Sequence, residues 1–214
     1  MSRTHDVPQR SPEWFALRAG AVTGSRAGVM LSTTRSGAEP RGKAKLRVEL
    51  ALERLQGANL EPTYQNADML HGVTYEPYAR TAYAVDQMVH VEEVGYVQHP
   101  TLEYVGCSPD GLVGTQGCLE IKAPAIHTHA EVLRKRAIPA DKMPQLIHTL
   151  FCTGRSWIDF CSFHPHFPDN AQLFIKRLRR DEVDLEEYQQ HLEVFLEDVQ
   201  AQVTAIQEWR ANEP

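Results

Sequence analysis

Two carboxylates and a lysine near the middle of the chain have the types and spacing to hold a divalent cation beside a phosphate. Asp110 lies in a Ser-Pro-Asp-Gly turn, and Glu120 and Lys122 lie in the apolar segment 118–122. Side chains alternate along a strand, so Glu120 and Lys122 project to one face while Ile121 points into the core and leaves its carbonyl free to bind a metal. Magnesium prefers such oxygen ligands, and a metal held there could make hydroxide available for hydrolysis of a phosphodiester.

The function of the lysine in such a site is open at this stage. The ammonium of Lys122 could orient a water molecule, assist its deprotonation, or stabilise the charge that builds on phosphorus. A Pro-Asp followed by Glu-x-Lys also fits an ordinary hairpin, because the turn 108–111 and the alternating strand 118–122 need no catalysis. The three residues therefore define a hypothesis that depends on the surrounding elements and motifs.

The elements expected around these residues alternate between helices and strands. A hairpin is predicted from a strand at 103–107, the turn at 108–111 and a strand at 118–122, and further strands are predicted at 87–98, 157–163 and 173–178. Helices are predicted at 12–18, 43–55, 66–84, 127–136 and 144–153, and along an amphipathic segment from 185 to 206. A further helix is predicted to start near residue 23, where a Thr or Ser hydroxyl can cap it. We expect the helix at 185–206 to cover the sheet. The pattern predicts a mixed α/β fold.

Length and composition favour one compact unit. The chain has 214 residues, of which 42% are hydrophobic, so residues 1–214 are expected to form a single domain with one core. The polar N-terminal residues contain no apolar run of the length that a signal peptide or membrane span needs, which predicts a cytoplasmic protein with no membrane partner. The four cysteines form no CxxC pair and are expected to be buried free thiols.

The charge of the chain is distributed unevenly. The formal net charge of −6 argues at first against a nucleic-acid partner, because phosphate binding depends on Lys and Arg. Basic residues nevertheless predominate between 18 and 47 and again at 176–180, whereas acidic residues gather between 181 and 198. This asymmetry permits a basic DNA-facing surface, although solvated helix faces explain each charge run equally well.

The sequence around these residues resembles the lambda exonuclease and viral-recombinase nuclease family of the PD-(D/E)xK superfamily. Four motifs carry the resemblance in order between residues 14 and 150, whereas the last 60 residues share only a helical ending. The four motifs are an N-terminal W-x3-R-x4-T-x-S signature at Trp14–Ser25, a G-x2-[YL]-E helix motif at His71–Glu76, the core runs Cys107–Leu112 and Leu119–Pro124, and a glutamine-bearing helix at Met143–Gln145.

The resemblance implies a restriction-endonuclease-like fold, with a central mixed β-sheet flanked by helices in a single domain. It implies that the catalytic residues are Glu76, Asp110, Glu120 and Lys122. The metal ligands that it implies are Asp110, Glu120 and the backbone carbonyl of Ile121, binding Mg²⁺, with Mn²⁺ as a substitute.

The family also has a pocket for the 5′-terminal phosphate of the digested strand. Matching positions place Arg18, Ser25 and Ser108 in that pocket, with Gln145 close by. An arginine that reaches into DNA corresponds to Arg35, and an apolar wedge that separates the strands corresponds to Met69. Ordinary interpretations stay open. Arg18 could be a surface charge and Ser25 a helix cap, and Glu76 could be a solvated helix residue. Arg35 could be an exposed loop side chain, and Met69 a core methionine.

The function implied by the resemblance is magnesium-dependent 5′-to-3′ digestion of double-stranded DNA from its ends. The enzyme would release 5′-mononucleotides and leave 3′ single strands for recombination by strand annealing. The implied setting is a homotrimer ring around DNA, a single-strand annealing protein as partner, and a phage or prophage gene expressed in the bacterial cytoplasm.

Two other functions remain open. One is another PD-(D/E)xK nuclease, either a restriction-like endonuclease or an enzyme with an iron–sulfur cluster, although the cysteine spacing does not favour a cluster. The other is a non-catalytic DNA-end-binding module, which would be expected to lack one of the carboxylates, whereas both Asp110 and Glu120 are present.

Overall fold

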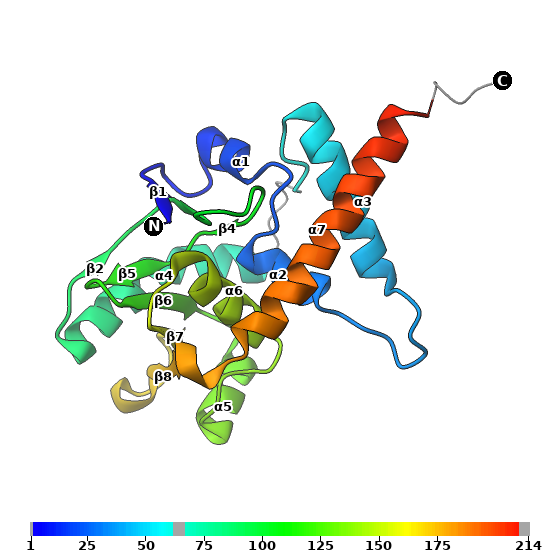
Figure 1. Ribbon diagram of the computed structural model, residues 1–214. Coiled ribbons are helices and arrows are strands. Elements are labelled where there is room, and N and C mark those ends of the chain that lie inside the picture. Colours follow the sequence, from blue (N-terminus) through cyan, green and yellow to red (C-terminus); the bar gives the residue numbers. More distant parts are fainter. Residues whose placement is uncertain (1, 62–66, 210–214) are drawn as a thin grey trace.

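A five-stranded mixed sheet lies at the centre of the computed structural model, which describes residues 2–61 and 67–209 (Figure 1). The strand order is β2 (Val91–Glu92), β5 (Gly111–Val113), β6 (Gly117–Lys122), β7 (Trp157–Phe163) and β8 (Leu173–Arg179). Strands β6 and β7 are parallel, and the other neighbouring pairs are antiparallel. The predicted α/β fold with a central mixed sheet is confirmed.

The parallel pair needs a crossover, because the end of β6 must return to the start of β7. Helices α5 (Ile126–Lys135) and α6 (Met143–Thr153) form that connection. Short 3-10 helices at Asp169–Ala171 and Arg180–Glu182 precede and follow β8. The helices predicted at 127–136 and 144–153 correspond to α5 and α6, and their bounds differ from the observed ones by at most one residue.

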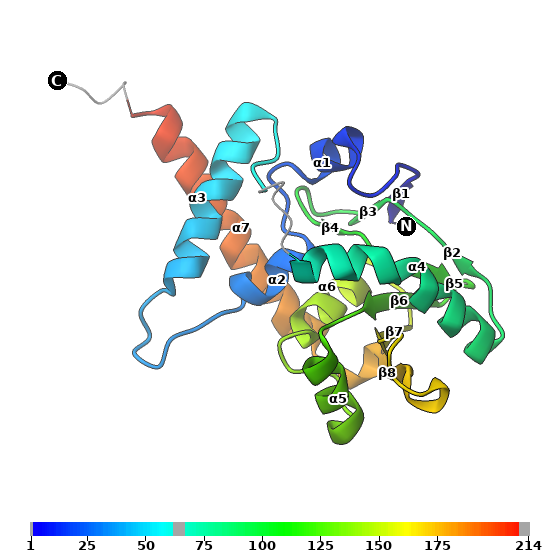
Figure 2. The same ribbon diagram turned by 180° about the vertical axis from the view of Figure 1, so that it is seen from behind.

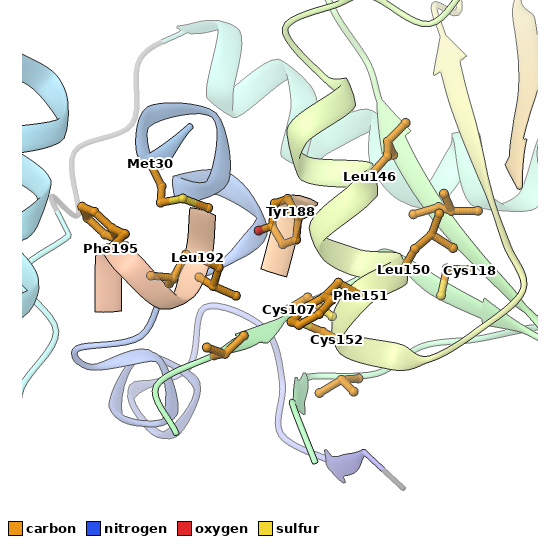
Figure 3. Packing of buried hydrophobic residues seen from close by; sticks show 14 of the residues in the cluster. Met30, Cys107, Cys118, Leu146, Leu150, Phe151, Cys152, Tyr188, Leu192 and Phe195 are labelled. Atoms are coloured by element: carbon orange, nitrogen blue, oxygen red, sulfur yellow. The ribbon is translucent and has the colours of Figure 1, made fainter. Parts of the chain in front are cut away.

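The two faces of strand β6 pack against different helices. Leu119 and Ile121 belong to a buried cluster with Ala79 and Tyr83 of helix α4 (Ala67–Gln87). The opposite face carries Cys118, which belongs to the main core with Leu146 and Leu150 of α6 (Figure 3). Strict alternation along β6 therefore directs residues 120 and 122 to the same side as residue 118, towards α6.

Four further helices come from the two ends of the described chain. Helices α1 (Pro12–Arg18), α2 (Gly24–Met30) and α3 (Arg41–Gln56) come from the N-terminal quarter, and α7 (Leu185–Gln207) ends the described chain. In both views, α3 and α7 lie side by side at the edge of the molecule (Figures 1 and 2). The prediction that the last helix covers the sheet was wrong, since α7 packs chiefly against α3.

The buried stripe of α7 explains this position. Tyr188, Leu192 and Phe195 point towards Met30 of α2 and the α6 region, as Figure 3 shows. Val199 and Val203 continue the stripe along α3 at the same helical spacing. The apolar periodicity identified a buried face, but the partners of that face are helices.

A small second sheet accounts for the largest differences from the predicted strands. It has the order β1 (Arg3–His5), β3 (Tyr96–Gln98) and β4 (Gly106–Cys107). The strand predicted at 87–98 is in fact two strands in different sheets, β2 and β3. The chain turns between them at Gly95, where the Val7 carbonyl approaches so closely that there is no space for a side chain.

The predicted hairpin also differs from the observed one. Strand β4 pairs with β3, and the partner of β6 is β5, which follows the turn that contains Asp110. The reversal between β5 and β6 uses Gly114, whose positive φ of 51° is a conformation that glycine adopts readily. Asp110 therefore precedes the hairpin, and its backbone N–H bonds to the Leu119 carbonyl across from it.

No helix within residues 2–61 and 67–209 combines the length and apolar character that crossing a membrane requires. The four cysteines are free and buried, as predicted.

Candidate active site

A cavity of about 570 Å³ lies where α1, α2, α4 and α6 meet the ends of β5 and β6. The predicted site residues come from separate parts of the sequence, and all of them except Arg35 line this one cavity. They are Arg18, Ser25, Met69, Glu76, Ser108, Asp110, Glu120, Ile121, Lys122 and Gln145.

Glu120 is the buried acid on the cavity side of strand β6. Its side chain is only 2% exposed. Oxygen Oε1 accepts hydrogen bonds from Lys122 Nζ and from Gln145 Nε2, each at 2.5 Å. Oxygen Oε2 is buried and has no hydrogen-bond partner. A buried carboxylate oxygen without a partner is costly, and a bound cation would remove that cost.

Asp110 is held against the same strand by the backbone. Its Oδ2 accepts a hydrogen bond from the Ile121 N–H at 2.6 Å. Burial, and then the negative charge of Glu120, raise the pKa of Asp110 well above its usual range. The two carboxylates are therefore close enough to repel each other, as expected for a pair that shares a cation.

Lys122 completes the charged cluster. Burial alone lowers the pKa of an ammonium group, but the carboxylates of Glu120 and Asp110 outweigh burial, and the pKa of Lys122 is raised overall. The ammonium is therefore charged and directed at Glu120. One positive charge offsets only part of the negative charge on two carboxylates.

The donor set fits magnesium. Two carboxylates and the Ile121 carbonyl are hard oxygen donors, and protein-bound magnesium usually combines one or two carboxylates with substrate phosphates and water. Within the described residues, no group of three or more His, Cys, Asp or Glu side chains is arranged to hold a metal by itself. A cation at Asp110 and Glu120 would therefore take further ligands from the backbone, the substrate and water.

Glu76 reaches the cavity from α4 and is held by two arginines. Its carboxylate forms ion pairs with Arg80 at 2.7 Å and with Arg10 at 3.3 Å. Arg80 also donates from Nε to the Asp110 carbonyl at 3.0 Å and pairs with Glu93 at 2.9 Å. Arg80 thus connects α4 to the turn of Asp110. Sequence reasoning missed it, although its position four residues after Glu76 was a signal.

The Arg18 side chain is buried, which excludes the interpretation as a surface charge. It is 6% exposed, and its guanidinium lies 4.0 Å from the ring centroid of Trp14. Nη2 contacts the Ser25 hydroxyl at 3.4 Å and both carboxylate oxygens of Glu61 at 3.0 and 3.1 Å. A buried guanidinium beside a hydroxyl can bind an anion, and in this structure the anionic partner of Arg18 is the Glu61 carboxylate.

Trp14 also positions the serine of the next motif. Its indole N–H donates to Ser108 Oγ at 2.8 Å and to the Gly95 carbonyl at 3.1 Å. One side chain therefore supports both Arg18 and Ser108. Trp14 stood in the N-terminal motif, but its contacts could not be deduced from the sequence.

Helices α2 and α6 touch at the cavity, which Gly24 and Gln145 both line. A side chain at Gly24 would place its Cβ 3.2 Å from Gln145 Cγ, so the glycine lets α6 approach. Thr23 is the N-cap of α2, but its side chain makes no capping hydrogen bond, so the prediction that a Thr or Ser hydroxyl caps this helix was wrong. Its hydroxyl instead contacts Arg18 Nη2 and Ser25 Oγ.

Met69 and Arg35, the two residues expected to reach into DNA, lie in different places. Met69 lines the cavity and is 51% exposed, so it is not a core methionine. Arg35 is exposed in the loop between α2 and α3 and does not line the cavity. This loop extends away from the sheet in both views (Figures 1 and 2).

Known proteins share the fold and part of the sequence of this chain. The YqaJ-like viral recombinase domain matches residues 13–156. The crystal structure of an alkaline exonuclease, LHK-Exo, from Laribacter hongkongensis is 34% identical, with a TM-score of 0.85 over 94% of this chain and 98% of that one. LHK-Exo in complex with dAMP is 35% identical, with a TM-score of 0.84 over the same shares.

A phage-related exonuclease from Haemophilus somnus 129PT shares the fold, at 13% identity and a TM-score of 0.67 over 88% of this chain and 96% of that one. The search of curated proteins found no match.

Proposed function

The chain belongs to the YqaJ-like viral recombinase family, the lambda exonuclease family, and from this premise we propose that it is a magnesium-dependent 5′-to-3′ exonuclease of double-stranded DNA. Family membership makes it a DNA exonuclease, and therefore a hydrolase, with a restriction-endonuclease-like fold. The direction of digestion, the metal and the released product are the proposed part.

The observation that carries the proposal is that one cavity contains both the acidic pair and the buried arginine. Asp110 and Glu120 lie on one wall, and Arg18 and Ser25 lie on another. A strand whose terminal phosphate binds Arg18 could place its next phosphodiester at the acidic pair. This arrangement favours an enzyme that measures from a phosphorylated 5′ end over an endonuclease that cuts within a duplex.

We assign the cation to Asp110, Glu120 and the Ile121 carbonyl, with Mg²⁺ as the usual ion and Mn²⁺ as a substitute. When bound, the cation supplies charge neutralisation at the phosphoryl oxygens and makes hydroxide available near neutral pH. This set, with Lys122, would make the site one of PD-(D/E)xK type.

The remaining residues act on substrate and water. Arg18, Ser25 and Ser108 hold the terminal phosphate by charge-assisted hydrogen bonds. The charged Lys122 lies where it can orient the attacking water or stabilise the charge developing on phosphorus. Gln145 fixes Glu120, and Glu76 adds a further carboxylate at the cavity edge.

The products follow from which bond breaks. Water attacks the phosphorus, and the bond to the 3′ oxygen of the terminal nucleotide breaks. A 5′-mononucleotide leaves with the original terminal phosphate, and the shortened strand begins with a new 5′ phosphate. Repetition leaves a 3′ single strand for recombination by annealing.

The proposed assembly extends beyond the single chain. We propose that residues 1–214 act as one domain, that three copies enclose DNA as a homotrimer, and that a single-strand annealing protein takes up the 3′ strand. A ring would keep a chain of net charge −6 on its substrate by topology as well as by electrostatics. A phage or prophage gene expressed in the bacterial cytoplasm fits this role.

The proposal is tested with linear duplex DNA that carries a 5′ phosphate on one strand, incubated with Mg²⁺ or EDTA. We expect release of 5′-mononucleotides from the phosphorylated strand with Mg²⁺ only. The Asp110→Asn variant should bind ends without digesting them. Digestion in EDTA, digestion from 3′ ends, or cutting of closed circular DNA would each contradict the proposal.

A further inference from the structure

We propose that Glu61 is an internal competitor for the terminal-phosphate pocket and promotes release of the mononucleotide product after each cut. The inference rests on the proposed function, in which Arg18 and Ser25 hold that phosphate. Glu61 precedes the 62–66 gap between the two described parts of the chain and belongs to none of the predicted site motifs.

The competition arises at one nitrogen atom. Arg18 Nη2 points to the Ser25 hydroxyl at 3.4 Å and to both Glu61 oxygens at 3.0 and 3.1 Å. Within the described residues, Glu61 is the only carboxylate paired with Arg18. A phosphate that bridges Arg18 Nη2 and the Ser25 hydroxyl would therefore either share this nitrogen with Glu61 or displace it, and the buried Nε of Arg18, which has no hydrogen-bond partner in the described part of the chain, is a further donor for it.

Glu61 is not needed to neutralise the neighbouring buried arginine. Arg26 pairs with the fully buried Glu53 at 2.5 Å and donates to the Ala21 carbonyl at 2.9 Å, so its contact with Glu61 at 3.1 Å is an addition. The Glu61 side chain is 24% exposed, whereas that of Glu53 is 0% exposed. Glu61 can therefore turn to solvent while Arg26 keeps its main partner.

Competition by Glu61 at Arg18 would help the enzyme between one cut and the next. The mononucleotide that leaves carries the phosphate that Arg18 held, and the pocket must empty before the shortened strand can advance. A dianionic phosphate on a buried arginine would leave slowly if nothing replaced it. The Glu61 carboxylate supplies the replacement, because it restores the charge balance of Arg18 as the product departs.

The test compares binding of dAMP and inorganic phosphate to the full-length protein and its Glu61→Gln variant, by calorimetry in EDTA. We expect both anions to bind the variant about three- to tenfold more tightly, with deoxyadenosine unaffected. In Mg²⁺, dAMP should inhibit digestion by the variant at correspondingly lower concentration. Glu13→Gln removes the same charge from an exposed position at the start of α1 and should leave binding unchanged.

The double variant Arg18→Ala, Glu61→Gln should lose the gain, because the competition needs the guanidinium. Glu61→Ala is the second variant if Glu61→Gln fails to fold. Unchanged or weaker anion binding in a folded Glu61 variant would overturn the inference, and weaker binding would show that Glu61 positions Arg18. This result is separate from the exonuclease assay, since digestion of 5′-phosphorylated duplex by the unaltered protein tests the proposed function alone.

Discussion

The side-chain amide of Gln145 donates to Oε1 of Glu120 at 2.5 Å and so ties helix α6 to strand β6. Lys122 donates to the same oxygen. With both donors on Oε1, the buried Oε2 is the oxygen left without a partner. Gln145 and Lys122 together therefore leave Oε2 as the oxygen of Glu120 that could face a cation.

Replacement of Gln145 by alanine should weaken metal binding and slow digestion. Removing a partner that orients a metal ligand typically costs about 10- to 100-fold in metal affinity or activity. The measurement is the Mg²⁺ dependence of digestion, together with Mn²⁺ binding followed by electron paramagnetic resonance. Gln189→Ala, on the exposed side of α7, is the control. Equal Mn²⁺ affinity in Gln145→Ala and the unaltered protein would contradict the assignment.

Arg80 should matter to the metal site without touching the metal. Arg80→Ala removes the ion pair with Glu76 and the hydrogen bond to the Asp110 carbonyl. We expect Mn²⁺ affinity to fall by about tenfold or more, with partial recovery in Arg80→Lys. Glu93→Gln removes only the outward contact and should have little effect. If Glu93→Gln and Arg80→Ala weaken Mn²⁺ binding equally, the contacts of Arg80 with Glu76 and the Asp110 carbonyl do not support the metal site.

Arg18→Ala should reduce the preference for phosphorylated ends. Hydrogen bonds to charged groups contribute about 1.5 to 3 kcal/mol, which corresponds to roughly 10- to 100-fold in the ratio of digestion from 5′-phosphate and 5′-hydroxyl ends. The ratio is measured on matched duplexes under single-turnover conditions. Arg41→Ala removes an exposed charge from the start of α3 and should preserve the ratio. An unchanged ratio in Arg18→Ala would remove this residue from the phosphate pocket.

Stability should fall on mild acidification because of His148. Burial lowers the pKa of this imidazole from its ordinary 6.5 to about 4. A histidine whose folded pKa is lowered stabilises the fold fully above pH 6.5, and this contribution is lost as the pH falls from 6.5 to 4. The loss amounts to about 3 kcal/mol at most.

Urea unfolding at pH 7.5, 5.5 and 4.5 measures that loss. His148→Gln cannot titrate, so its free energy of unfolding should decline less over this range. Some decline should remain, because burial also lowers the pKa of His99, His129 and His164. A decline as steep as that of the unaltered protein would show that His148 does not contribute.

The longer elements were predictable because their patterns are local. Strand β7 was predicted with its observed bounds, and the helices differ by few residues, since apolar periodicity extends through each of them. The two-residue strands β2 and β4 exist only through pairing with distant strands, which no local pattern encodes. The amphipathic stripe of α7 likewise indicated burial but not its partner α3.

The candidate site divides in the same way. Alternation along β6 placed Glu120 and Lys122 on one face and Ile121 on the other, as the structure has them. The partners that hold these residues were not predictable. Arg18 meets Glu61 across 43 residues and Arg80 meets Asp110 across 30, and such pairings depend on how whole helices pack.

The close approach of Gly24 to Gln145 has a practical consequence for engineering. Any side chain at position 24 would press on the residue that orients Glu120. Redesign of α2 to accept a different strand terminus would therefore also alter the cleavage step. End preference and turnover in this protein are expected to change together, because a single glycine sets the spacing between the helices that serve them.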